Sequence, residues 1–190
     1  MNVCIIGDGL TSLTLAKNLI KKKLNVHIYQ QKKTKRPSTN RTIGISSKNF
    51  EFFKKNIESF KGMNAWKINK IEIFSEKIKN GKILNFEKKN NSLFYMIKND
   101  QLYKLLNNKL LKSKFFKKIL IKENNCYQKI LKKDKYDLII NCDPFNYLAK
   151  KYFYKKIEKN YNNLAYSVIL KHEKLNNETA SQVFTKFGPI

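Results

Sequence analysis

The fold of this chain is decided by its opening stretch, Asn2-Val3-Cys4-Ile5-Ile6-Gly7-Asp8-Gly9-Leu10-Thr11-Ser12-Leu13. The apolar first half predicts a strand that ends at Gly7, and the amphipathic run through Ile20 predicts a helix directly behind Gly9. Gly7 allows a tight turn, and Gly9 has no Cβ to keep the backbone away from a pyrophosphate. The helix N-terminus offers unpaired N–H groups to phosphate oxygens. This pattern predicts the opening of a dinucleotide-binding βαβ unit.

Two positions differ from the usual dinucleotide-binding motif. Ser12 stands in place of the third glycine, and it is small enough for close helix–strand packing. The next predicted strand, residues 25–29, leads into Gln30, which follows Gly9 by 21 residues. About 20 residues are expected before the acidic residue that binds the adenosine ribose. Because the Gln30 amide oxygen still accepts a hydroxyl hydrogen bond, we expect a weakened ribose ligand. The alternative is that the glycines serve only a strand–helix turn.

The composition indicates a globular protein with one core, or one domain and part of another. The chain has 190 residues, of which 42% are hydrophobic and 13% aromatic. No apolar run approaches the roughly 20 residues of a membrane span, and the chain opens on a strand, so we expect neither a span nor a signal peptide. Cys4, Cys126 and Cys142 lie far apart in apolar contexts. We expect buried, reduced thiols of a cytoplasmic protein, with no metal site.

The net charge of +26 raises the question of nucleic-acid binding. All but two of the 40 basic residues are lysines, the exceptions being Arg36 and Arg41. Proteins that recognise phosphates and bases favour the guanidinium group of arginine. The lysines of this chain are also spread along its whole length. We therefore expect a solvated basic surface and no specific nucleic-acid partner. The positive charge favours loose attraction to anionic lipid headgroups over specific nucleic-acid binding.

Further along the chain, hydrophobic periodicity predicts alternating helices and strands. We expect helices from Ser47, as the cap, to about Ser59, and again behind a capping Asp100. The predicted strands and hairpin cover 71–73, 83–86, 93–97, 118–121, 127–131 (the hairpin), 136–142, 165–170 and 182–187. The apolar run 136–142 leads into Asp143-Pro144. An aspartate after such a strand lies where open α/β sheets bind ligands, although a plain turn aspartate is an equal alternative.

Four segments together resemble the FAD-dependent aromatic hydroxylases of the para-hydroxybenzoate hydroxylase class, and most closely the ubiquinone-biosynthesis monooxygenases. The segment 7–12 matches the FAD pyrophosphate turn, and 41–46 (RTIGIS) resembles the R-x-x-A-L-S stretch whose arginine lies against the flavin nucleotide. The segment 137–143 resembles the strand before the family's Asp-Gly motif. Finally, 184–190 (FTKFGPI) resembles the F-T-x-x-G-P segment of the ubiquinone branch.

The resemblance implies an α/β fold: a Rossmann-type FAD-binding core over 1–65 and 99–158, with a smaller antiparallel substrate-domain sheet over 66–98 and 159–190. It implies an FAD-dependent monooxygenase, with NAD(P)H as transient reductant, that hydroxylates a polyprenylated phenol or another aromatic ring. The cofactor-binding residues it implies are Gly7, Gly9, Leu10, Ser12, Gln30, Arg41 and Asp143. Because the flavin carries the chemistry, no catalytic residue is assigned. His27, His172, Trp66 and Tyr95 are expected to be structural.

Three departures from the family's pattern bear on activity. Gln30 replaces the ribose glutamate, and Pro144 replaces the glycine after Asp143, which removes a backbone N–H. The chain also ends before the family's later Gly-Asp motif. The resemblance therefore implies a C-terminally truncated form, either a fragment or a shortened relative that is inactive.

Two rival functions remain open. Lys32, Lys33, Lys35 and Arg36 follow Gln30 and could hold a 2′-phosphate, which would make the chain an NAD(P)-binding oxidoreductase. A noncatalytic basic binding module is the second rival, and it predicts an affinity for oligonucleotides that falls steeply with salt. We expect the protein to be located in the cytoplasm. Peripheral contact with the inner membrane face is a further expectation.

Overall fold

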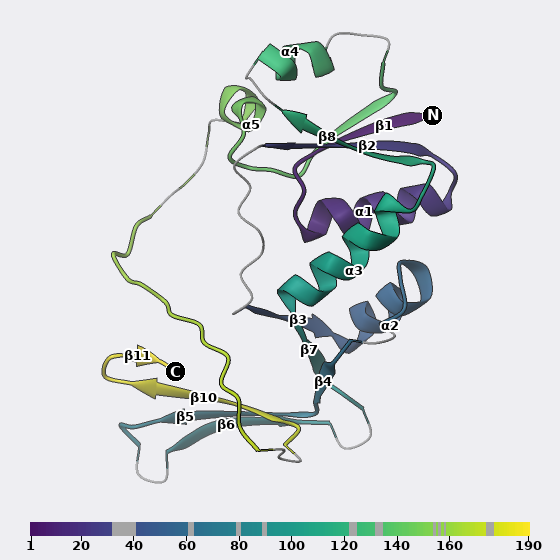
Figure 1. The fold of residues 1–190 in the computed structure, drawn as a ribbon. Coiled ribbons are helices and arrows are strands. Elements are labelled where there is room, and N and C mark those ends of the chain that lie inside the picture. Colours follow the sequence, from purple (N-terminus) through teal and green to yellow (C-terminus); the bar gives the residue numbers. More distant parts are fainter. Residues whose placement is uncertain are drawn as a thin grey trace. The chain divides into compact units, whose positions relative to one another are not determined.

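The computed structural model describes residues 1–31, 41–60, 63–78, 81–88, 91–121, 125–131, 135–153, 155, 157, 159–173 and 177–190. The chain forms two compact units (Figure 1). The first comprises Met1–Thr39 with Asp100–Ser167, and the second comprises Asn40–Asn99 with Val168–Ile190.

The first unit is a parallel sheet with helices on both faces. Its four strands are β1 (Asn2–Ile6), β2 (Asn25–Gln31), β8 (Phe116–Ile121) and β9 (Leu138–Asn141), in the order β8-β2-β1-β9. Figure 1 shows α1 (Leu10–Lys21) and α3 (Asn99–Leu111) on one face of the sheet and α4 (Asn125–Leu131) on the other. The short helix α5 (Tyr147–Tyr152) follows β9. The strand order reverses between β1 and β9, which is the topological switch point of a Rossmann-type fold.

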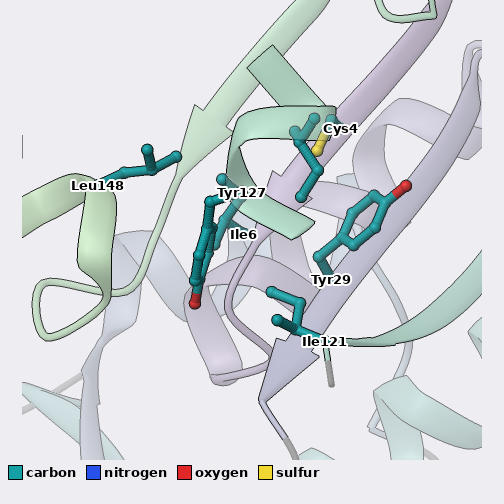
Figure 2. Packing of buried hydrophobic residues seen from close by; sticks show 7 residues of the cluster. Cys4, Ile6, Tyr29, Ile121, Tyr127 and Leu148 are labelled. Carbon is teal, nitrogen blue, oxygen red and sulfur yellow. The ribbon is translucent and has the colours of Figure 1, made fainter. Parts of the chain in front are cut away.

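The core of this unit is built on the central strand β1. Val3, Cys4, Ile5 and Ile6 are at most 1% exposed, as expected for a parallel strand covered on both faces. On the α4 face, Cys4 and Ile6 pack with side chains from β2, β8, α4 and α5 (Figure 2). Burial raises the pKa of the Cys4 thiol to about 12. Cys4 and Cys142 are free thiols, and the side chain of Cys126 lies outside the described part of the structure.

The second unit consists of two small sheets and one helix. Strands β3 (Thr42–Ser46), β7 (Phe94–Lys98) and β4 (Ala65–Ile68) form an antiparallel sheet, and α2 (Ser47–Asn56) follows β3. The other sheet has the order β11-β10-β5-β6, with β5 (Lys70–Ser75), β6 (Lys82–Glu87), β10 (Thr179–Thr185) and β11 (Gly188–Pro189). Strand β10 pairs with β5 in parallel, and the other pairs are antiparallel. The predicted combination of a Rossmann-type core with a smaller, mainly antiparallel region is confirmed.

Several predicted elements were wrong in type or boundary. The hairpin predicted around Tyr127 is the helix α4. The N-cap of α2 is Ser46, whose hydroxyl accepts from the Asn49 amide at 3.4 Å, and not Ser47. Helix α3 begins at Asn99, so Asp100 lies in its first turn instead of capping it. The strand predicted over 165–170 has no regular structure, because no other strand pairs with it in the described chain.

The compact units divide the chain differently from the domains that we predicted. We placed 1–65 and 99–158 in the core, whereas β3 and α2 fall in the second unit. The reason is the pairing of β3 with β7, from Thr42 against Lys98 to Ser46 against Phe94. The predicted domain bounds stay a prediction. Among the described helices, none combines the length and the apolar character needed to cross a membrane.

Candidate dinucleotide-binding site

The carboxyl ends of β1 and β9 meet closely at the switch point. Gly7 has a φ of +103°, and a Cβ placed on it would lie 3.0 Å from the Cβ of Asp143 and 3.3 Å from its backbone nitrogen. The Cys142 amide donates to the Ile6 carbonyl at 2.9 Å and holds the two strand ends together. Only glycine fits this position without strain. In open α/β sheets, this crevice is where ligands bind.

Gly9 differs from Gly7 in both conformation and surroundings. Its φ of −71° and ψ of 177° are extended, and a Cβ placed on it would meet nothing within 4 Å. Gly9 is the N-cap of α1, where no side chain caps the helix and no acidic residue lies in the first turn. The first-turn N–H groups, which have no partner within the helix, and the partial positive charge of the helix end therefore carry no compensating side chain in the described turn. A methyl group added at Gly9 therefore meets no described atom apart from its chain neighbours.

Ser12 packs where a third glycine was expected. Its residue is 1% exposed, and its hydroxyl has no hydrogen-bond partner among the described residues. Burying an unpaired hydroxyl costs free energy. Ser12 therefore holds an unused hydrogen-bonding group in the first turn of α1. Leu10, also predicted at the site, is the first residue of that helix and is partly buried.

Gln30 lies beside the glycine turn because the Gly7 amide donates to the Tyr29 carbonyl at 2.8 Å. Strand β2 continues two residues further than the predicted 25–29, and Gln31 donates to the Tyr127 hydroxyl at 2.7 Å on the α4 face. Since side chains alternate along a strand, Gln30 faces the opposite side, which carries α1 and α3. The partly exposed Gln30, and not Gln31, is therefore the candidate ribose ligand.

Asp143 has a structural role in the turn after β9. Its Oδ1 accepts from the Phe145 amide at 2.9 Å, as a turn aspartate does. Asn141 Oδ1 accepts from the Asp143 amide at 3.1 Å and from Asn146 Nδ2 at 2.6 Å. The fully buried Asn146 in turn caps α5 by accepting from the Ala149 amide at 2.8 Å. Asn146 is not among the residues predicted from the sequence, although an asparagine before an apolar segment is a known N-cap signal.

The predicted site residues are divided between the two units. The residues that share the first unit are Gly7, Gly9, Leu10, Ser12, Gln30 and Asp143. Arg41 belongs to the second unit, where it is exposed and its carbonyl accepts from the Asn99 amide at 2.9 Å. Lys32, Lys33, Lys35 and Arg36, on which the NAD(P) alternative depends, lie outside the described residues.

A polar network that was not predicted from the sequence is centred on Asp8, the residue between the two glycines. Tyr103 of α3 donates its hydroxyl to Asp8 Oδ2 at 3.1 Å. Lys118 of β8 donates to the Tyr103 hydroxyl and to Asn107 Oδ1, both at 3.1 Å, and its Nζ lies 3.5 Å from Asp8 Oδ2. These residues are 95 or more positions apart from Asp8 in sequence, so local patterns give no signal for the contact.

The two histidines lie in different surroundings. His27 Nδ1 lies 2.8 Å from the Tyr136 hydroxyl, which also contacts the Tyr29 hydroxyl at 2.8 Å. Burial, and then the charges of Lys135 and Lys117, lowers the pKa of His27, so its imidazole is neutral at pH 7. His172 is exposed, outside the regular elements.

Comparison with known proteins gives matches in fold alone. No protein-family model matches the chain, and no curated protein matches its sequence. Over 63% of its length the chain is similar to PqsL of P. aeruginosa in complex with 2-aminobenzoylacetate, with a TM-score of 0.53 and 12% identity. A second PqsL structure, called a probable FAD-dependent monooxygenase from Pseudomonas aeruginosa, matches over 63% with a TM-score of 0.52 and 11% identity. This region shares its fold with FAD-dependent monooxygenases.

A third solved structure is also similar to the chain in fold. The p-nitrophenol 4-monooxygenase PnpA from Pseudomonas putida DLL-E4 matches 62% of the chain, with a TM-score of 0.50 and 11% identity. The chain spans only 33%, 32% and 31% of the lengths of the three neighbours. The shared region is thus about a third of each neighbour's chain.

Proposed function

We propose that the β1–α1 turn binds the adenosine and pyrophosphate of FAD, and that the chain provides this part of an aromatic-ring monooxygenase. The observation that carries the proposal is the open space in front of Gly9, at an uncapped helix N-terminus on the β1–β9 switch point. The shared fold with FAD-dependent monooxygenases supports FAD as the dinucleotide.

Each residue of the turn has a definite task in this proposal. Gly7 sets the tight turn, Gly9 admits the pyrophosphate, and the first-turn amides from Leu10 onward donate to its oxygens. The unpaired Ser12 hydroxyl supplies a further donor, and Gln30 accepts from the ribose hydroxyls. Bound FAD supplies the redox and oxygen chemistry, while the protein binds and orients it.

The proposal extends to the ring substrate, the reductant of the flavin and the location of the protein in the cell. We propose a polyprenylated phenol of ubiquinone biosynthesis as the ring substrate and NAD(P)H as the reductant, with Arg41 and Asp143 as further cofactor contacts. Support comes from the segment 184–190, whose F-T-x-x-G-P likeness spans the end of β10 and the strand β11. A prenylated substrate is membrane-borne, and the charge of +26 favours contact with anionic headgroups.

An equilibrium titration with FAD tests the cofactor assignment. The full chain, freed of bound nucleotide, is titrated with FAD while flavin fluorescence is followed, and NADP⁺ is the competitor. We expect saturable FAD binding that ADP competes away and NADP⁺ does not. Preferential binding of NADP⁺ would instead favour the nicotinamide alternative, and binding of neither would contradict the proposal.

Replacing Gln30 by glutamate should strengthen FAD binding. A carboxylate makes a charge-assisted hydrogen bond to the ribose hydroxyls, about 1 kcal/mol stronger than the amide bond, which corresponds to roughly fivefold in affinity. The same charge repels a 2′-phosphate, so NADP⁺ should bind no better than before. Calorimetry on the variant checks both expectations, with Gln31→Glu as the control on the opposite face. Tighter NADP⁺ binding by Gln30→Glu would contradict the assigned position of Gln30.

A further inference from the structure

The Asp8 carboxylate is placed where a negative charge opposes the proposed ligand. Asp8 directly precedes Gly9, so their Cα atoms are about 3.8 Å apart. A unit charge within ~10 Å of another in a partly buried site changes affinity by about tenfold. An uncompensated Asp8 would therefore weaken the binding of a diphosphate at the turn.

The structure supplies the compensating charge. Lys118 is 16% exposed and Asp8 is 11% exposed, so solvent screens their interaction less than it screens a surface ion pair. Tyr103 connects the two groups, since it donates to Asp8 and accepts from Lys118. Asn107 fixes the Lys118 ammonium from the other side. Every charged group in the network thus has a partner.

Tyr103 stays a hydrogen-bond donor over the physiological range. Burial, together with the adjacent Asp8 carboxylate, raises the pKa of the Tyr103 hydroxyl to about 12. The hydroxyl is therefore protonated at neutral pH, and its proton is directed at Asp8 Oδ2. The network connects the turn to α3 and β8, two elements that lie far along the chain from β1.

We propose that Lys118, acting with Tyr103, is a positioning residue of the dinucleotide site: it neutralises Asp8 and fixes its carboxylate, so that the glycine turn attracts a diphosphate. This inference rests on the proposed function. It states that the affinity for the dinucleotide depends on the balance between the charges of Asp8 and Lys118. Lys118 acts through Asp8 and does not itself contact the ligand. Removing the Lys118 charge should therefore weaken dinucleotide binding only when residue 8 carries a negative charge.

A double-mutant cycle tests this dependence. Affinities for FAD and ADP are measured for the full-length wild type, Lys118→Met, Asp8→Asn and the double variant. We expect Lys118→Met to bind both ligands about tenfold more weakly. Asp8→Asn should bind as well as the wild type or better, and the double variant should return to within about twofold of the wild type. The weakening in Lys118→Met should also shrink at 1 M salt, where the Debye length is about 3 Å.

Two further variants separate charge from packing. Lys117 is the exposed neighbour on β8, so Lys117→Met removes one lysine without touching Asp8 and should change affinity less than about twofold. Lys118→Gln keeps a donor but lacks the charge, and it should show the same loss as Lys118→Met. It also serves as the test variant if Lys118→Met does not fold.

The outcomes are distinguishable. Wild-type affinity in both Lys118→Met and Lys118→Gln would overturn the inference, and so would a double variant as weak as Lys118→Met, because the loss would then come from packing. In both cases the wild type still binds FAD and the proposed function stands. If the wild type binds neither FAD nor ADP, the proposed function fails, and this inference fails with it.

Discussion

Gly9→Val should bind FAD more weakly than the wild type by a factor on the order of a hundred or more. The branched side chain would occupy the open space in front of α1, where the pyrophosphate is proposed to lie. Loss of two charge-assisted hydrogen bonds at ~1.5–3 kcal/mol each accounts for an effect of this size. Fluorescence titration with FAD, and calorimetry with ADP, measure the change.

The same variant should fold normally, which makes the result interpretable. Gly9 has extended dihedral angles that valine adopts readily, and a Cβ at this position would contact nothing within 4 Å. The free energy of unfolding should therefore change by no more than about 1 kcal/mol, the typical effect of an N-cap replacement. Undiminished FAD affinity in a folded Gly9→Val protein would show that the pyrophosphate lies elsewhere.

Gly7→Ala should destabilise the protein by about 3 kcal/mol. Alanine at a φ of +103° is strained, and its Cβ would lie 3.0–3.4 Å from the Asp143 Cβ and the backbone of residues 142–143. Backbone strain at a left-handed position costs ~1–3 kcal/mol, and overpacking adds a similar amount. Because native stabilities are about 5–15 kcal/mol, the midpoint of urea unfolding should fall markedly.

The neighbouring glycine provides the matched control for this experiment. Gly9→Ala adds the same methyl group two residues away, at a site with allowed dihedral angles and free space, and should cost less than about 1 kcal/mol. Equal losses of stability in Gly7→Ala and Gly9→Ala would mean that the β1–β9 contact does not impose the glycine at position 7.

The elements that could be predicted from the sequence are those set by local patterns. The run from Asn2 to Leu13 contains a strand, a turn and a helix start in consecutive residues, and all three are confirmed. The hairpin predicted at Tyr127 was wrong, although Tyr127, Ile130 and Leu131 already have helical spacing, i, i+3 and i+4. The segment 165–170 has β-prone residues, yet no strand in the described chain pairs with it.

The rest of the candidate site depends on contacts between distant residues. The closeness of Gly7 to Asp143, and the pairing of Asp8 with Lys118, arise only when β8 and β9 join the sheet. No window of sequence contains both partners of either contact. The spacing of Gln30 from Gly9 could be predicted because β2 is the next strand along the chain, and its role as ribose ligand stays a prediction.

The pairing of β1 with β9 also has a consequence for synthesis on the ribosome. Val3 pairs with Leu138, 135 residues later, whereas its other partner, Val26, is only 23 residues away. At elongation rates of ~5–20 residues per second, one edge of β1 has no partner strand for roughly 7–27 s, until β9 has been synthesised. During that interval an apolar strand edge is open to wrong pairing, a recognised cause of aggregation. Heterologous expression should therefore give more folded protein at reduced temperature or with added chaperones, and slow assembly of β9 should limit refolding.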